Sequence, residues 1–230
     1  MRYADVTKAR FLERPNRFIA LVETASGTER VHVKNTGRCR ELLLPGAVVY
    51  LERGTAPGRK TAFDLIAVEK ETDRGTLLIN MDAQAPNAVF AEFAASGQFR
   101  SDVRAVRREV AWGASRIDFL LDTDAGPRLV EVKGVTLEDD GAARFPDAPT
   151  ERGVKHLREL QAAVENGTAA AVFFVIQMEG MKTFSPNDDT HPAFGAALRE
   201  AAARGVDVQA WECAVTPASL NIVRPVPVVL

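Results

Sequence analysis

The sequence is poor in cysteine and has no long apolar segment. Its two cysteines, Cys39 and Cys213, lie far apart in the 230 residues, which argues against a disulfide framework and a cysteine-based zinc site. No apolar run approaches the roughly 20 residues that a membrane-spanning helix needs. Residues 1–6 also lack the apolar core of a signal peptide. We therefore expect a cytoplasmic protein.

A strong net charge is missing as well. The formal net charge is −2, and the hydrophobic and charged fractions of 46% and 26% are typical of a globular protein. This balance argues against simple electrostatic capture of nucleic acid. The charge is uneven, however, with +4 over residues 1–80 and −6 over residues 81–230. A basic first part suits phosphate contacts, and an acidic second part suits a metal site.

Short alternating segments dominate residues 1–82. Turn signals separate five expected strands, at residues 18–24, 28–34, 47–52, 62–69 and 76–82. In the second of these, Val31 and Val33 alternate with basic side chains, giving one apolar and one basic face. Five short strands in this length predict a small closed barrel of the OB type, whose exposed strands often bind oligonucleotides. We expect residues 1–82 to form a nucleic-acid-binding domain.

The hydrophobic period changes after residue 82. Helices are expected from residue 87 to Gly97, at 151–165 and at 194–204, with strands at 106–112, 117–122, 128–133, 171–178 and 206–213. Thr150 is a natural N-cap for the second helix. The order α-β-β-β-α-β-α-β predicts an α/β domain over residues 83–230 that matches the restriction-endonuclease-like, PD-(D/E)xK core.

Two of these strand-like segments, residues 115–121 and 129–133, contain acids where a buried strand would avoid them. Asp118 interrupts the first, and Glu131 and Lys133 stand two apart on the second, so alternation points both to one face. If the segments are antiparallel neighbours, Asp118 and Glu131 converge on one divalent cation. Acids spaced by about a dozen residues before a lysine in this way are typical of metal-dependent nucleases.

A plainer interpretation is surface decoration, because exposed acid–lysine pairs are common and contribute little. The apolar neighbours of Asp118 and Glu131 favour a functional role, since buried charge is costly unless it is paired or metal-bound. Carboxylates suit Mg²⁺ or Mn²⁺, and the backbone carbonyl of Val132 is a further candidate ligand. Lys133 is expected to position or deprotonate the attacking water, or to stabilise charge on the phosphate.

A third acid is usual on the first helix of such a core. Glu92 is our choice, and Glu109 on the following strand is its competitor. A solvated helix charge is an equally good interpretation of Glu92.

Basic side chains supply candidate contacts to nucleic acid. At the start of the second helix, Arg152 and Lys155 are placed to contact phosphates, aided by the helix N-terminus. A helix-stabilising Glu151–Lys155 pair is the alternative interpretation, and His156 is expected to be a structural hydrogen-bonder. Other basic residues complete the set of candidate nucleic-acid contacts: Lys34, Arg38 and Arg116.

Several longer motifs resemble one family, the sugar fermentation stimulation protein A family, over nearly the whole chain. The matching segments are residues 35–38, 115–120, 131–137 and 145–160, with shorter matches at 184–186 and 204–206. Lys34 departs from the proline expected before the first of them. The resemblance implies DNA binding linked to the regulation of sugar use, an OB-like N-terminal domain and a nuclease-like C-terminal domain.

The favoured hypothesis is therefore a DNA-binding protein with a Mg²⁺-dependent nuclease site. The alternative is a DNA-binding transcriptional regulator of sugar metabolism with a vestigial nuclease fold. Intact Asp118, Glu131 and Lys133 favour retained chemistry, because converging carboxylates would only repel the phosphates that a pure binder must hold. A sugar- or nucleotide-binding role has no motif behind it, since the sequence contains no glycine-rich phosphate loop.

Overall fold

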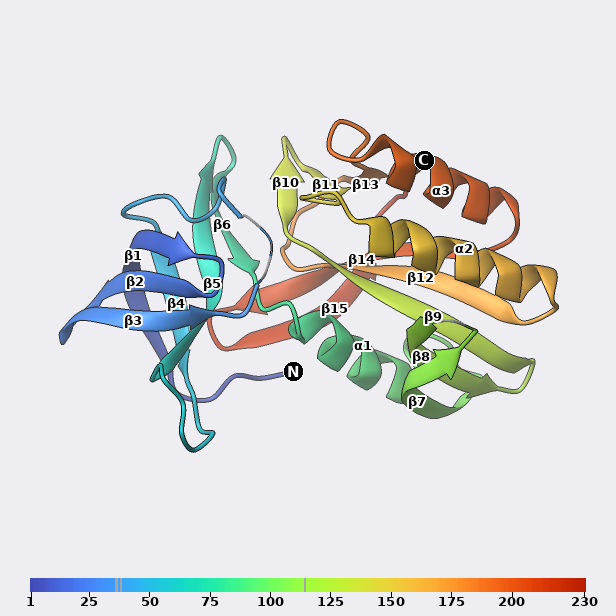
Figure 1. Ribbon diagram of the computed structural model, residues 1–230, viewed down its shortest axis with the longest axis horizontal. Coiled ribbons are helices and arrows are strands. Elements are labelled where there is room, and N and C mark those ends of the chain that lie inside the picture. Colours follow the sequence, from blue (N-terminus) through green and yellow to red (C-terminus); the bar gives the residue numbers. More distant parts are fainter. Residues whose placement is uncertain (36, 38, 114) are drawn as a thin grey trace. The chain divides into compact units, whose positions relative to one another are not determined.

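The computed structural model describes residues 1–230 except 36, 38 and 114 (Figure 1). The chain forms two compact units. The first comprises residues 1–85, 177–179 and 213–221, and the remainder forms the second. Residues 177–179 and 213–221 thus fold with the first unit. The division expected near residue 82 is linear and assigns both segments to the second domain. Within the described residues, none of the helices has the length and apolar character to cross a membrane.

The first unit is built on a closed β-barrel. Its strands are β1 (Val6–Asn16), β2 (Ile19–Thr24), β3 (Gly27–Val33), β4 (Val48–Arg53), β5 (Phe63–Thr72) and β6 (Gly75–Asn80). They neighbour one another in the order β3-β2-β1-β4-β5-β6, and a parallel pairing of β3 with β5 closes the ring of the first five. Strand β6 continues from β5 as a hairpin. This five-stranded ring confirms the OB-like prediction.

Strand β1 is the barrel strand that the sequence analysis missed. Its buried side chains, Ala9 and Phe11, alternate as a half-buried strand requires. Charged neighbours and Pro15 hide this alternation in the sequence. The ring depends on the strand, because β1 pairs with both β2 and β4.

A six-stranded sheet organises the α/β part of the chain. Its order is β15-β14-β12-β9-β8-β7. The strands are β7 (Val103–Trp112), β8 (Ser115–Thr123), β9 (Gly126–Val135), β12 (Ala169–Ile176), β14 (Asp207–Thr216) and β15 (Ser219–Pro225). A small second sheet contains β10 (Leu137–Asp139), β11 (Ala142–Phe145) and β13 (Thr183–Pro186), and the helices are α1 (Ala85–Ala95), α2 (Glu151–Glu165) and α3 (Pro192–Ala203). The main elements follow the predicted order, confirming the restriction-endonuclease-like core; β10, β11, β13 and β15 are additional.

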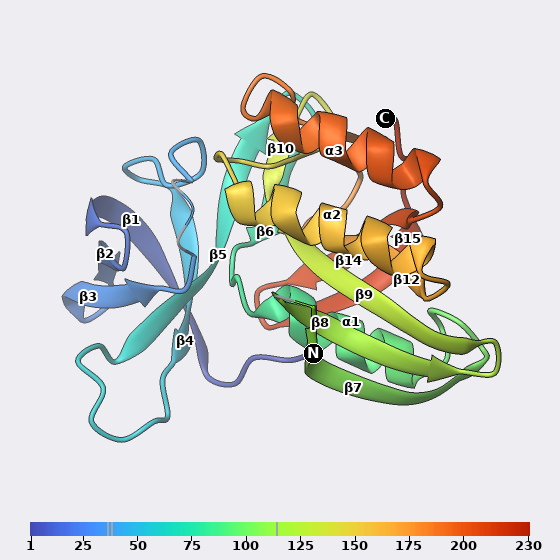
Figure 2. The same ribbon diagram turned by 45° about the vertical axis from the view of Figure 1, so that its right-hand side comes forward.

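Helix α1 covers one face of the sheet, and α2 and α3 lie on the other (Figure 2). Strand β12 explains this arrangement, because its successive side chains point to opposite faces. The ring of Phe173 lies 4.8 Å from that of Phe90 on α1. The ring of Phe174 lies 5.6 Å from Phe145, which in turn lies 5.1 Å from Phe194 on α3. The central strand is thus buried on both faces, as its continuous apolar sequence predicts.

We expect Phe173→Ala to lower the free energy of unfolding by about 3–5 kcal/mol, because it leaves a cavity between several aromatic rings. Urea denaturation followed by circular dichroism measures the loss. Val223→Ala, at a side chain that is 49% exposed, is the control and should stay within about 0.5 kcal/mol of wild type. Equal effects of the two substitutions would contradict this description of the core.

Candidate metal centre

The site forms where two neighbouring strands separate. Strands β8 and β9 pair from Thr123 and Gly126 as far as Phe119 and Val130. Beyond that point β8 pairs only with β7, while β9 continues along β12. The next two residues in register are Asp118 and Glu131. Because opposite residues of an antiparallel pair share a face, both acids point to the same side of the opening.

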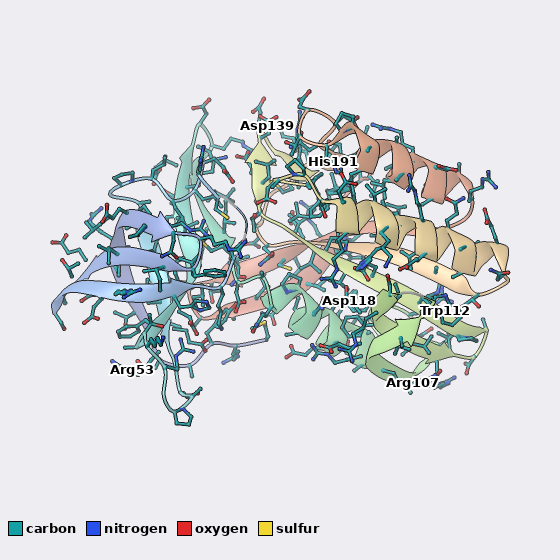
Figure 3. The ribbon with its side chains drawn as sticks, viewed as in Figure 1. Arg53, Arg107, Trp112, Asp118, Asp139 and His191 are labelled. Atoms are coloured by element: carbon teal, nitrogen blue, oxygen red, sulfur yellow. The ribbon has the colours of Figure 1, made fainter. Side chains whose placement is uncertain are left out.

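The carboxylate of Asp118 accepts a hydrogen bond where the backbone pairing of β8 with β9 has ended. Its Oδ2 accepts a hydrogen bond of 2.9 Å from the backbone N–H of Val132, and its Oδ1 accepts one of 3.0 Å from Nδ2 of Asn87. Asp118 thereby lies on β8 in the region where α1, β8 and β9 come together (Figure 3). The N–H and C=O groups of a strand residue point the same way, so the carbonyl of Val132 also faces the opening.

Glu131 is held by two donors on one oxygen. Its residue surface is only 2% exposed, and its Oε1 accepts a 2.6 Å hydrogen bond from Nζ of Lys133. The same oxygen is bonded to Nδ1 of His156 on the buried face of α2. Its other oxygen, Oε2, is buried without a hydrogen-bond partner among the described residues. Such a buried acceptor costs free energy unless something binds it.

The tautomer of His156 follows from its second contact. Nε of Arg152 donates to Nε2 of His156 at 3.3 Å. A ring nitrogen that accepts a hydrogen bond carries no proton, so in this network the proton of the neutral imidazole sits on Nδ1. His156 therefore donates to Glu131 and fixes which carboxylate oxygen remains available.

The two acids differ in their proton affinity. Burial, and next the negative charge of Glu131, raise the pKa of Asp118 above its ordinary value. Burial would also raise the pKa of Glu131, but the hydrogen bond from His156 and the charge of Lys133 bring it below its ordinary value. A cation placed between the two carboxylates would favour the ionised form of both.

The donor set fits a hard divalent cation. Two carboxylates and a backbone carbonyl are oxygen ligands of the kind that Mg²⁺ and Mn²⁺ prefer. The unpartnered Oε2 of Glu131 is a ready ligand atom. In the described part of the chain, no group of three or more His, Cys, Asp and Glu side chains is arranged to hold a metal. The centre thus offers two acids, which is enough for Mg²⁺ because this ion usually keeps several waters.

The predicted third acid does not join the pair. Glu92 is exposed on α1, and the residue of that helix that reaches Asp118 is Asn87. Five residues further along a helix lie about 140° around its axis, so Glu92 faces another direction. Its competitor Glu109 is exposed as well and forms an ion pair with Arg116 at 3.3 Å. The role of Glu92 as a third acid stays a prediction.

Sequence reasoning missed Asn87, whereas the expected hydrogen-bonding role of His156 is confirmed. Asn87 has no motif around it, and only the packing of α1 brings it to Asp118. A signal for His156 does exist, since the buried residues of α2 include Val154, His156, Leu157 and Leu160. A histidine on that apolar face needs a buried partner, and Glu131 is that partner.

The basic residues of α2 lie beside the centre. Arg152 is bonded to His156, as described above, and Lys155 is 55% exposed. Lys155 pairs with Glu159 at 3.7 Å, whereas Glu151 pairs with His191 at 3.2 Å. Arg116 is 69% exposed and lies two residues before Asp118, on the same face of β8.

The predicted phosphate contact of Lys34, in the first unit, is not supported. Its ammonium group lies between three carboxylates, at 3.5 Å from Glu52, 3.7 Å from Asp64 and 3.2 Å from Asp82. Its side chain is only 19% exposed. These acids neutralise it and would repel a phosphate. Arg38, the other candidate near this position, lies outside the described residues.

A closed five-stranded barrel, followed by an α/β sheet with an acid pair where two strands part, defines an OB-type and restriction-endonuclease-like two-domain protein. Family comparison agrees with this class. Residues 12–79 match the SfsA N-terminal OB domain, and residues 84–219 match the sugar fermentation stimulation protein RE domain. The chain belongs to the sugar fermentation stimulation protein (SfsA) family.

Relatives match along the whole chain. A sugar fermentation stimulation protein homolog of Desulfitobacterium hafniense is 51% identical over 96% of this chain and 95% of its own length. The homolog of Clostridium beijerinckii is 47% identical over 100% of both chains. Among solved structures, that of Pyrococcus furiosus SfsA in complex with Ca²⁺ superimposes with a TM-score of 0.89 at 26% identity, covering 100% of this chain and 98% of the other.

The affinity for a divalent cation should rise with pH as Asp118 loses its proton, because proton and cation compete for the carboxylate. Because the pKa of Asp118 is raised, the cation affinity should increase at a higher pH than it would for an aspartate with an ordinary pKa. Without cation, the contribution of Asp118 to stability should fall over the same range, since the folded protein holds the proton more tightly than the unfolded chain.

Calorimetric titration with Mn²⁺ between about pH 4 and pH 7 measures this dependence. Asp122→Asn, which removes an exposed acid from the same strand, is the control and should leave the curve unchanged. A flat affinity over this range would contradict the assignment of Asp118 as a ligand.

His156→Asn should retain cation binding, because an asparagine amide nitrogen can take the place of Nδ1 and still donate to Glu131. His156→Gln places its amide nearer to the position of Nε2 and should weaken binding by about 10- to 100-fold, as is typical when a hydrogen-bond partner of a ligand is lost. The same Mn²⁺ titration distinguishes the two. Equal losses would show that His156 matters only for packing.

Proposed function

We propose that this protein is a Mg²⁺- or Mn²⁺-dependent phosphodiesterase that acts on nucleic acid, with DNA as the expected substrate. The observation that carries the proposal is that Asp118 and Glu131 come next in register where β8 and β9 separate, with Lys133 on the same face. Oε2 of Glu131 has no hydrogen-bond partner among the described residues. Glu131 is buried and Asp118 is half-buried, and a cation would offset the repulsion between their charges.

A bound divalent cation would supply Lewis-acid chemistry and lower the pKa of a coordinated water. Asp118, Glu131 and the carbonyl of Val132 would hold it. Lys133 has three N–H donors, of which one bonds to Glu131. The other two can donate to a non-bridging phosphate oxygen, where negative charge develops as the phosphodiester is attacked.

Arg152 is the best-placed contact for a neighbouring phosphate. Its Nε donates to His156, which fixes the guanidinium beside the centre. The two terminal nitrogens would be the donors to a phosphate. It also lies in the first turn of α2, where the helix dipole favours an anion. Lys155, one turn later and exposed, is a second contact, and Arg116 on β8 is a third.

The related Pyrococcus furiosus SfsA structure supports the cation, since that protein was obtained in complex with Ca²⁺. Ca²⁺ and Mg²⁺ share oxygen ligands but differ in the geometry they demand. A non-enzymatic DNA-binding regulator remains the second candidate, because the described centre offers two acids and the expected third acid, Glu92, points elsewhere.

The deciding experiment is a cleavage assay on single- and double-stranded DNA and RNA in the presence of Mg²⁺, Mn²⁺ or EDTA. Cleavage that requires the cation supports the nuclease. Binding without cleavage under every condition supports the regulator.

Glu131→Gln keeps the shape of the side chain but removes a ligand charge, so cation affinity and cleavage should fall together. Lys133→Ala should leave the cation bound and slow cleavage by about 10² to 10³, the usual effect of losing one electrostatic donor. Glu165→Gln and Lys182→Ala, at exposed positions, are the matched controls and should behave like wild type. Variants and wild type that bind DNA equally and never cleave would leave the regulator as the answer.

A further inference from the structure

The first unit contains a pocket that the metal centre does not explain. Its cavity of about 430 Å³ lies between the β1–β2 turn and the segment that follows β3. This volume is within the range of small-ligand sites. The residues that line it are Arg14, Asn16, Arg17, Gly37, Cys39, Arg40 and Leu43.

The lining is basic and contains no carboxylate. Arg17 and Arg40 are exposed, and no acid among the described residues forms an ion pair with either of them. Two arginines that face a cavity without a counter-charge make it attractive to an anion. A guanidinium presents a planar fork of donors that matches the oxygens of a phosphate, so a phosphate group is a suitable anion for this pocket.

A third arginine builds the pocket. Arg14 donates to the backbone carbonyls of Arg17 at 2.6 Å, of Asn35 at 2.8 Å and of Gly37 at 2.9 Å. These hydrogen bonds tie the β1–β2 turn to the segment after β3, which form the two walls of the cavity. The two walls of the cavity are thus held together by the hydrogen bonds of Arg14, a residue of barrel strand β1.

An exposed aromatic ring stands next to this pocket. Phe18 follows Arg17 in the turn and is 43% exposed, which is unusual for a phenylalanine. Its backbone is fixed, since its N–H donates to Oδ1 of Asn16 and its carbonyl accepts from the N–H of Val33. The guanidinium of Arg17 lies 4.6 Å from the centre of the ring. Arg17 therefore lines the pocket and also forms a cation–π pair with Phe18.

We propose that the pocket and Phe18 form a binding site for single-stranded nucleic acid, with a backbone phosphate held by Arg17 and Arg40 and an adjacent base stacked on Phe18. OB-type barrels bind single strands through this combination of a basic groove and an aromatic platform. The base must be unstacked to reach the ring, which excludes an intact duplex. This site goes beyond the proposed cleavage and does not depend on it.

Fluorescence anisotropy of the full-length protein in EDTA tests the site, with a labelled oligothymidylate of about ten nucleotides and a duplex of the same length. Phe18→Ala should weaken binding of the single strand by about 5- to 150-fold, the value of one stacked base. It should leave duplex binding unchanged, and Phe18→Tyr should bind like wild type. Arg40→Ala should reduce the slope of log affinity against log salt concentration for the single strand by about 1, as the loss of one phosphate contact predicts.

Val223→Ala and Arg2→Ala, which remove an exposed apolar and an exposed basic side chain elsewhere, are the matched controls. An abasic oligonucleotide should bind wild type and Phe18→Ala equally. Equal losses for single strand and duplex, or no loss with Phe18→Ala, would overturn the proposal. A third outcome is that Phe18→Ala has no effect while inorganic phosphate displaces the single strand at a concentration that leaves duplex binding intact. That result would show that the pocket binds anions only.

Because EDTA removes the divalent cation, this assay is independent of cleavage. Asp118→Asn should keep the difference between Phe18→Ala and wild type even if it abolishes all cleavage. Failure of the single-strand site would leave the proposed nuclease untouched, and failure of the nuclease would leave this site testable.

Discussion

The hydrogen bond from the N–H of Val132 to Asp118 is the interaction on which the centre depends. Two strands cannot part inside a protein without leaving backbone groups unpaired, and a buried unpaired N–H is costly. The carboxylate of Asp118 satisfies that group and so stabilises the opening. It also brings a charge beside Glu131, which the rest of the site must accommodate. His156, Lys133 and Asn87 all bond to one of these two acids.

These contacts divide the two acids into distinct roles. Glu131 is surrounded by donors that keep it ionised, and Asp118 is the acid whose proton is harder to remove. The donors on Glu131 converge on a single oxygen, and the other oxygen has no hydrogen-bond partner among the described residues. For the proposed cation, an asymmetric pair of this kind would need little rearrangement, because hydrogen bonds already hold both carboxylates.

Alternation in the sequence was sufficient to predict that Glu131 and Lys133 share one face, because strand geometry is local. The barrel and the order of the α/β elements were predictable for the same reason. Asp118 was expected beside Glu131 only if their two strands are antiparallel neighbours, as β8 and β9 are. The sequence could not show that Asn87, rather than Glu92, bonds to Asp118, because only the packing of α1 decides which of its polar positions faces the sheet. It also could not show the ion pairs of Lys34, because its three acidic partners come from separate parts of the chain. Strand β1 was missed because its apolar signal consists of two residues among charges.

The way the chain returns to the first unit has a consequence for its biogenesis. Residue 177 lies almost a hundred positions after the last barrel strand, yet the Gln177 side chain donates to Oδ1 of Asn80 and to the carbonyl of Asp82. The N–H of Tyr3 donates to the carbonyl of Ala218, close to the other end of the chain. During synthesis on the ribosome, the barrel strands therefore emerge well before the segments around Gln177 and Ala218 that complete their polar contacts. The first unit can form all of these contacts only after much of the second unit has been synthesised.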